Sequence, residues 1–128
     1  MYYLTTKEVL RIHYVVVKQF GGRQGIRELS LVESAVARPQ AAYGVVEAYP
    51  DLFTKASALF YSLIKNHGFI DGNKRTAVIA CAIFLKRNNY EFIVSQNELV
   101  EFTITIASGD LAESKICEWL KKHSQKLR

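Results

Sequence analysis

The stretch HGFIDGNKRTAVIACAIFLKR, from His67 to Arg87, joins a polar cluster to the most apolar segment of the chain. Its second part, Ala77 to Leu85, is an uninterrupted apolar run whose alanines allow neighbouring helices to approach closely. Such a run predicts a central helix from Thr76 to Arg87 that other helices cover on all sides. The first nine residues gather a histidine, a carboxylate, an amide and two cations, which is atypical of a simple connection.

A second helix is predicted immediately upstream of this stretch. Asp51 is a typical capping residue, and the apolar side chains that follow it recur at helical spacing as far as Asn66. The polar residues between them, Lys55, Ser57 and Ser62, are expected to point toward solvent. The polar cluster therefore falls in a short turn between two helices.

Four further helix starts are indicated by a capping residue that is followed three positions later by glutamate, a pattern that satisfies the free amides of a first turn. They are Thr5 with Glu8, Ser30 with Glu33, Ser95 with Glu98, and Asp110 with Glu113.

The remaining segments favour short extended structure. The segment from Arg38 to Pro50 is bounded by two prolines and broken by a glycine, which suits a hairpin or flap. Tyr2 to Leu4 and Tyr90 to Val94 are also expected to be extended. Because no repeat or linker interrupts the sequence, residues 1–128 are predicted to form a single, mainly α domain.

The composition is that of an ordinary globular domain, with 128 residues, 49% of them apolar and 23% charged. No apolar run approaches the roughly 18 residues of a membrane-spanning helix, and the first residues lack a signal-peptide pattern. We therefore expect a cytoplasmic protein with no membrane partner. Cys81 and Cys117 lack metal-ligand spacing and are expected to be small core residues.

The net charge is +5, and a share of it lies at the C-terminus in Lys121, Lys122, Lys126 and Arg128. Cations at the end of a helix complement its dipole, and no aromatic residues of the kind that stack on bases are interleaved with them. Nucleic-acid binding is therefore not expected.

The cluster that begins at His67 has the residue types that bind and transfer a phosphate. The residues from Gly72 to Arg75 fall on the first turn of the predicted central helix, where free amides and the dipole attract an anion. Asp71 is a hard ligand of the kind that holds magnesium, and a histidine can accept a hydroxyl proton near neutral pH. Together these features favour phosphoryl or nucleotidyl transfer from a magnesium nucleotide to a hydroxyl.

Each residue of the cluster also has an ordinary explanation when it is taken alone. His67 could end the preceding helix or lie satisfied in the core, and Asp71 could cap the helix that follows. Lys74 and Arg75 could be surface charges. The spacing by itself does not decide between these explanations and a transfer site.

The nine residues HGFIDGNKR, His67 to Arg75, resemble the signature of the Fic/Doc family, in the form typical of its death-on-curing (Doc) toxin branch. The resemblance extends upstream through GIRELSLVESAVARPQAAYG and downstream to Tyr90. It implies a small, mainly helical domain with a short β-hairpin flap, and the flap is the family element that holds a target peptide as an added strand.

The resemblance also implies roles for the residues of the motif. His67 would be the general base, Phe69 the anchor of the motif in the core, Asp71 the magnesium ligand, Gly72 and Asn73 the anion hole, and Lys74 and Arg75 the catalytic cations that hold the nucleotide phosphates. The implied cofactors are ATP and Mg²⁺.

Two positions bear on which phosphate is transferred. Fic proteins that transfer AMP have a glycine after the asparagine and commonly a second arginine, where this sequence has Lys74 and Val78. The resemblance to the Doc branch implies transfer of the γ-phosphate of ATP to a threonine of elongation factor Tu, which stops translation. AMP transfer and a catalytically inactive module that binds a nucleotide or a partner are the alternatives.

The same branch implies a cognate antitoxin whose disordered segment folds into a groove beside the active site. A self-inhibitory helix is not expected, because Trp119 follows Ser114 to Glu118 where the family pattern has glycine or asparagine.

Three residues near these patterns receive no catalytic role. Gly68 stands where relatives often have proline, and it is expected to loosen the turn that directs His67. His13 and His123 have no neighbour at metal-ligand spacing and are expected to be structural.

Overall fold

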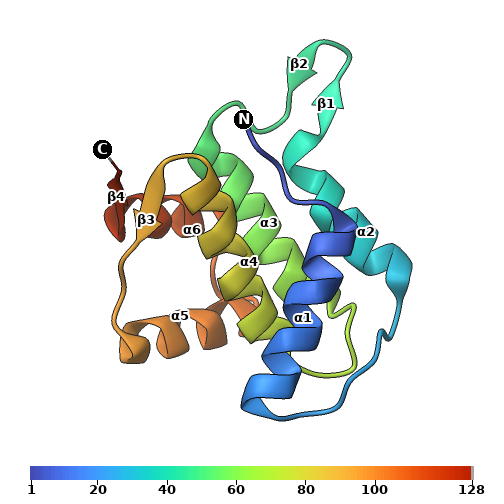
Figure 1. The fold of residues 1–128 in the computed structure, drawn as a ribbon. Coiled ribbons are helices and arrows are strands. Elements are labelled where there is room, and N and C mark those ends of the chain that lie inside the picture. The colour runs from blue at the N-terminus through green and yellow to red at the C-terminus, as the bar shows by residue number, and fades with distance from the viewer. Residues whose placement is uncertain (128) are drawn as a thin grey trace.

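The computed structural model describes residues 1–127, which form six helices with two of them in the middle (Figure 1). The helices are α1 (Thr6–Phe20), α2 (Leu29–Ala37), α3 (Leu52–Asn66), α4 (Asn73–Arg87), α5 (Gln96–Ser108) and α6 (Glu113–Lys122), and a 3-10 turn, η1 (Arg38–Gln40), follows α2. In Figure 1, α3 and α4 stand between α1 and α2 on one side and α5 and α6 on the other. The predicted mainly α fold is confirmed.

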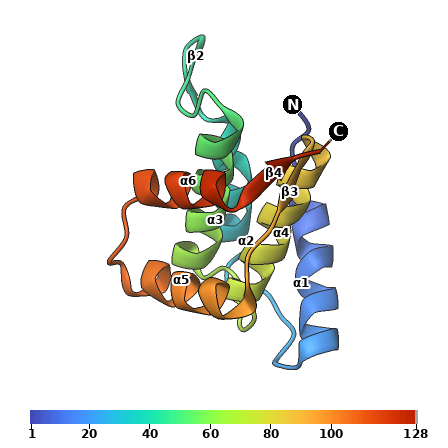
Figure 2. The ribbon, with the colours of Figure 1, turned by 90° about the vertical axis from the view of Figure 1, so that its left-hand side faces the viewer.

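Two short antiparallel sheets complete the fold. β1 (Ala42–Tyr43) pairs with β2 (Val46–Glu47) in the predicted hairpin, which projects from one end of the molecule in both views (Figure 2). β3 (Tyr90–Phe92) pairs with β4 (Ser124–Lys126). The end of the chain, which the sequence predicted as a solvated helix terminus, is therefore partly a strand. Three polar residues are too short a signal to identify one.

The predicted caps at Thr5, Asp51 and Ser95 are confirmed, because each side chain accepts a bond from the main-chain N–H three residues later. The other two are wrong, although the helices exist. α2 begins one residue before Ser30, and α6 begins three residues after Asp110. These two side chains bond to neighbouring side chains instead, Ser30 to Glu28 and Asp110 to Ser108.

The side chains predicted to leave α3 for solvent are buried instead. Lys55 and Ser57 are 2% exposed and Ser62 is 5% exposed, because α3 contacts α2, η1, α4, α5 and α6. The hydroxyl of Ser57 donates to the carbonyl of Glu113 at 2.9 Å, and that of Ser62 accepts a bond from Arg38 at 2.8 Å. Both polar groups are thus satisfied inside the helix bundle.

The helix that the sequence predicted to be surrounded is the second most enclosed. α4 contacts α1, α3 and β3, and it buries Ala77, Ala80 and Phe84 while Val78 and Ile83 stay half-buried. Two buried helices, α3 and α4, therefore take the place of the single central helix that was predicted, and α3 is covered on more sides than α4. No helix within residues 1–127 has the length and apolar character that crossing a bilayer requires.

Of the two cysteines expected in the core, only Cys81 lies there. Cys81 is fully buried on α4, where burial raises its pKa, and Cys117 on α6 is partly exposed. The C-terminal helix α6 buries Ile116 and Leu120 and packs Trp119 against the core, as an amphipathic helix does.

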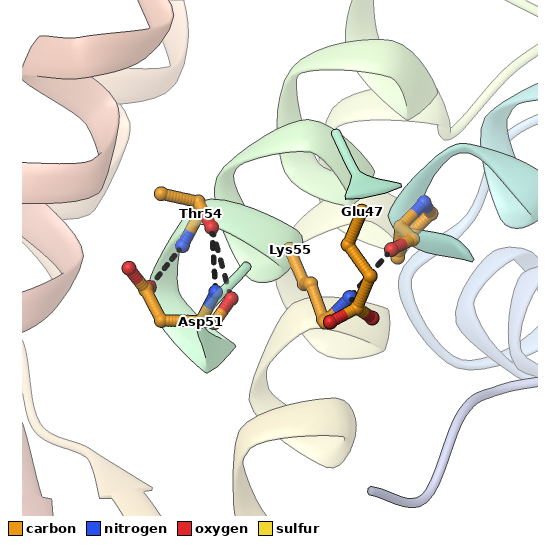
Figure 3. Close-up of polar contacts among 5 residues, drawn as sticks. Glu47, Asp51, Thr54 and Lys55 are labelled. Carbon is orange, nitrogen blue, oxygen red and sulfur yellow. Dashed lines mark hydrogen bonds and ion pairs between the residues drawn. The ribbon is translucent and has the colours of Figure 1, made fainter. Parts of the chain in front are cut away.

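Lys55 joins three segments to the first turn of α3, and Figure 3 shows its position beside Glu47. Its Nζ donates to the carbonyl of Pro39 at 3.1 Å and to a carboxylate oxygen of Glu47 at 2.8 Å, and it lies 5.6 Å from the centre of the Tyr3 ring. Burial by itself disfavours the charge, but Glu47 and Tyr3 outweigh it and raise the pKa of Lys55 above its ordinary value. The hairpin is therefore attached to α3 by a buried cation.

This arrangement predicts that the half-exposed Glu47 matters more than an ordinary surface residue. Glu47→Ala should lower the free energy of unfolding by about 1–3 kcal/mol, because it leaves a buried ammonium without its counter-charge. Adding Lys55→Met should restore part of the loss, since it removes that charge and keeps the length of the side chain. Urea denaturation of the two single variants and the double variant measures this coupling. A Glu47→Ala variant as stable as the parent would contradict it.

The start of the chain is bonded to the C-terminal end of α4. The side chain of Asn88 bonds to the main-chain N–H and carbonyl of Tyr2, each at 2.9 Å, so Tyr2 to Leu4, which was expected to be extended, is held without pairing to a strand. Glu8 on α1 pairs with Arg87 and also accepts from the N–H of Thr5. These bonds, with Arg87 the larger cause, lower the pKa of Glu8 from 4.5 to about 2.

The free energy of unfolding should therefore fall as the pH drops from 4.5 toward about 2. A carboxyl with a depressed pKa stabilises the fold when it is ionised, and this contribution is lost on protonation. The Glu8→Gln variant should show a flatter dependence over the same interval, with a difference of about 1 kcal/mol for an exposed pair and a cap. Denaturation series on either side of the interval check this, and parallel curves for the two proteins would be the contrary result.

Candidate active site

The motif forms the loop between α3 and α4, at the end of these helices opposite the hairpin (Figure 1). His67 ends α3 in the left-handed conformation, with φ 51° and ψ 50°. Gly72 precedes α4 in the same region, with φ 75° and ψ 17°. The loop therefore reverses the chain with a left-handed residue at each end.

The main chain of the loop is bonded to the segment between α1 and α2. Ile26 and Phe69 form an isolated antiparallel bridge, in which the carbonyl of Gly68 accepts from the N–H of Arg27 at 2.8 Å. The side chain of Arg27 also donates to the carbonyls of His67 at 2.7 Å and Asn66 at 3.0 Å. Arg27 is a site-forming residue that sequence reasoning did not identify, although it lies inside the stretch that carries the resemblance.

The side chain of Asn73 holds the loop to the start of α4. Its Oδ1 accepts from the N–H of Phe69 at 3.0 Å, and its Nδ2 donates to the carbonyl of Phe69 at 2.9 Å. Asn73 is 5% exposed and Phe69 is 2% exposed. Because both groups of the amide bond to Phe69, the side chain of Asn73 is fixed toward the loop, and its main-chain N–H is left free at the start of α4.

His13 of α1 also contacts the loop, contrary to the expectation that it has no part in the site. Its ring stacks on Phe69 with centroids 3.8 Å apart and planes at 6°, and its Nε2 lies 2.8 Å from the carbonyl oxygen of Asp71. The sequence held one signal of this. His13 falls on the buried stripe of α1 with Val9 and Val16, so it had to face the core.

A cleft of about 780 Å³ opens beside the loop. It is lined by His67, Asp71, Gly72, Asn73, Lys74 and Arg75 of the motif, by Ile64, Lys65 and Val78 of α3 and α4, by Val16 and Gly21 near the end of α1, and by Gln96, Leu99, Val100, Thr103, Ile104 and Ala107 of α5. The structure thus brings together all the predicted site residues except Phe69, which lies beneath them. One wall is polar and the other is mostly apolar.

The carboxylate of Asp71 is fixed at the mouth of α4. One oxygen accepts from the N–H of Arg23 at 3.1 Å and the other from the N–H of Gly72 at 2.9 Å. These two main-chain bonds, that from Arg23 first, hold the pKa of Asp71 below its usual range. The group therefore stays ionised, and each oxygen keeps a lone pair for a cation.

The donor set of Asp71 can hold a magnesium ion only if a substrate supplies further oxygen ligands. Within residues 1–127 there is no group of three or more side chains that could enclose a metal. Mg²⁺ is commonly bound by one or two carboxylates together with phosphate oxygens and waters. The ionised, half-satisfied oxygens of Asp71 meet that requirement.

The first turn of α4 provides the anion-binding groups. Its first backbone bond runs from the N–H of Thr76 to the carbonyl of Gly72 at 3.0 Å, so the three preceding N–H groups point out of the helix end. Lys74 and Arg75 are exposed on the same turn and line the cleft. The guanidinium of Arg75 lies 4.3 Å from the centre of the Phe20 ring. Amides, dipole and two cations converge on one volume.

The hairpin lies at the opposite end of α3 from this cleft. None of residues 38–50 lines the cleft, and α3 separates the hairpin from the loop by 15 residues, about 22 Å at the rise of an α-helix. A peptide added to β1 or β2 would therefore have to continue for roughly seven extended residues to reach His67.

The model of the Fic/DOC family matches residues 3–85, which include α1 to α4 and the whole motif loop. The chain belongs to the Fic/DOC family.

Two relatives place it within that family. It is 45% identical over 89 residues to a protein named Toxin Doc from Mycolicibacterium smegmatis, a match that covers 70% of this chain and 66% of that protein. It is 27% identical over 122 residues to Protein kinase doc of Escherichia phage P1, with 95% of each chain covered. As a Fic/DOC protein it therefore falls in the Doc toxin branch, as the motif predicted.

Gly68 has a different effect from the one that its conformational freedom suggested. A Cβ at this position would lie 2.5 Å from Cγ2 of Val32 and 3.1 Å from the main-chain N of the same residue. The carbonyl of Gly68 is also bonded twice, to the N–H groups of Arg27 and Glu28. The glycine thus lets the loop approach α2 closely, and the turn is held rather than loosened.

Gly68→Ala should therefore lower the free energy of unfolding by about 1–3 kcal/mol through overpacking. The clash is mainly with a side chain, so the double variant with Val32→Ala should lose less stability than the sum of the two single changes. Urea denaturation of the three variants measures the coupling. Additive losses would mean that the two residues do not meet as the structure places them.

Proposed function

We propose that this chain is a toxin of a toxin-antitoxin pair that transfers the γ-phosphate of ATP to a threonine hydroxyl of elongation factor Tu, and so stops protein synthesis. The observation that carries the proposal is the convergence of His67, Asp71, Lys74 and Arg75 on one cleft at the amino end of α4. The relative from phage P1 is named a protein kinase, which supports the same reaction class.

The residues of the cleft have distinct parts in this reaction. His67, the general base, accepts the proton of the threonine hydroxyl, whose oxygen bonds to the γ-phosphorus. The bond from that phosphorus to the β,γ-bridging oxygen breaks, and ADP leaves. Lys74, Arg75 and the free N–H groups of the first turn of α4, which begin at Asn73, stabilise the charge on the phosphates. The N–H of Gly72, the other residue of the anion hole that the resemblance implies, is bonded to Asp71. A bound Mg²⁺, held by Asp71, would neutralise further phosphate charge.

The identity of two residues favours the γ-phosphate over AMP. Lys74 lies at the mouth of the cleft, and Val78 lies one turn further along α4 and also lines it. Lys74 fills the space that a glycine leaves open beside the phosphates in relatives that transfer AMP. The apolar Val78 stands where those relatives have a second phosphate-binding cation. AMP transfer is the alternative reaction, and a catalytically inactive binding module is the alternative of another class.

The apolar wall of the cleft supports the proposed antitoxin. Val100 and Ile104 of α5 are 49% and 56% exposed and line the cleft beside the motif. A disordered segment that folds against them would cover apolar surface and block the cleft. We also propose that residues 1–128 act as one domain in the cytoplasm, where elongation factor Tu works.

The test uses elongation factor Tu, Mg²⁺ and ATP labelled in parallel reactions at the α- or the γ-phosphate. Label from the γ-position alone should appear on a threonine, and His67→Ala should lower the rate by about 10²- to 10⁴-fold, as loss of a general base does. The fold of the variant is checked by its melting temperature.

Other outcomes would replace parts of the proposal. Label from the α-position would establish AMP transfer, and label from neither position would establish a binding module. γ-Label on a different protein in a bacterial lysate, with none on elongation factor Tu, would overturn the target but keep the kinase.

A further inference from the structure

Although it lies beneath the cleft and does not line it, His13 is bonded to the loop that carries the metal ligand. Its side chain is 3% exposed, and its Nε2 is 2.8 Å from the carbonyl oxygen of Asp71. A carbonyl oxygen only accepts, so Nε2 carries a proton that it donates. This bond is the direct connection between α1 and the end of the motif loop.

The bond restrains the peptide unit between Asp71 and Gly72. The carbonyl of this unit accepts from His13, and its N–H donates to Oδ1 of Asp71 at 2.9 Å. The two groups of one planar unit point in opposite directions. Fixing the carbonyl toward α1 therefore fixes the N–H toward the carboxylate.

A peptide unit that ends in glycine needs such a restraint. Gly72 has φ 75°, and glycine occupies positive and negative φ about equally well, so the unit could rotate at little cost. After rotation the carbonyl oxygen would face the carboxylate of Asp71, and one of that carboxylate's two main-chain bonds would be lost. The negative end of a dipole would also face the volume that receives the phosphates.

The ring of His13 is held where it can act in this way. It stacks on Phe69 with the planes at 6°, and a Cβ at Gly72 would lie within 3.8 Å of two of its atoms and 3.2 Å from Val17. The backbone at Gly72 thus lies directly against the imidazole and Val17, and the tight approach to Val17 favours a residue without a side chain. The stack on Phe69 fixes the plane of the His13 ring.

We infer that His13 is a positioning residue for Asp71. His13 holds the Asp71–Gly72 peptide unit, and the N–H of this unit directs the carboxylate of Asp71 toward the phosphates. This inference rests on the proposed function, because it assigns His13 to the magnesium side of that site. The family match and the names of the relatives give no role to this residue.

Two variants separate the hydrogen bond from the stacked ring. His13→Phe keeps a ring against Phe69 and removes the donor, whereas His13→Gln keeps a donor near the position of Nε2 and removes the ring. Removing a group that orients a metal ligand commonly costs about 10- to 100-fold in metal affinity or activity. We expect His13→Phe to raise by that factor the Mg²⁺ concentration needed for half-maximal γ-phosphate transfer, and His13→Gln to keep most of the parental value.

The second readout needs no catalysis. Hydrogen exchange of the ligand-free chain should show faster exchange at the N–H groups of Gly72 and Arg23 in His13→Phe, because both donate to Asp71. Protection of α3 should be unchanged, and His13→Gln should resemble the parent. If the parent transferred no phosphate, the proposed function would fail while this comparison would still test His13.

Three results would overturn the inference. Equal losses in the two variants would assign the effect to the ring and not to the bond. Parental exchange at Gly72 and Arg23 in His13→Phe would show that the peptide unit is held without His13. A His13→Phe variant that lost protection throughout α3 would mean that the residue only fills the core.

Discussion

Two hydrogen bonds between the side chain of Asn73 and the main chain of Phe69 support the rest of the site. Phe69 lies in the middle of a loop with no regular structure, and its N–H and carbonyl are buried where water cannot reach them. The amide of Asn73 satisfies both, as a neighbouring strand would do. The other edge of the loop pairs with Ile26 in an isolated antiparallel bridge. The loop is therefore held on both edges, as a central strand is, although neither neighbour is a strand.

This constraint explains how α4 can begin with two cations. Lys74 and Arg75 oppose the helix dipole, so the first turn of α4 is unfavourable by itself. Asn73 precedes these cations in the sequence. Its side-chain amide attaches the first turn of α4 to the core, because it bonds to the buried Phe69. Stability supplied by the core thus maintains an electrostatic arrangement that becomes favourable when an anion binds. Asn73, the first residue of α4, therefore offsets the unfavourable placement of the two cations that follow it.

How much could be predicted from the sequence depended on whether the cause was local. The boundaries of α3 and the caps at Thr5, Asp51 and Ser95 were predictable, because a cap and its amide lie within one turn. The motif residues of the cleft were predictable because the motif is continuous, whereas the lining residues of α5 lie far from it in the sequence and were not. The burial of Lys55 was not predictable, because polar residues on one face of a helix normally face solvent. Its charge is buried because the hairpin and η1 fold over it. His13 was missed for a related reason, because its partner lies 58 residues away.

α3 sets the distance between the two ends of the molecule. At one end Lys55 attaches the hairpin, and at the other His67 ends the helix and begins the loop. A helix whose backbone bonds are enclosed on nearly every side does not stretch or bend easily. A protein bound to the hairpin would therefore lie at a fixed distance from the cleft, and the length of α3 would set that distance. Only a partner that spans about 22 Å could contact both ends at once.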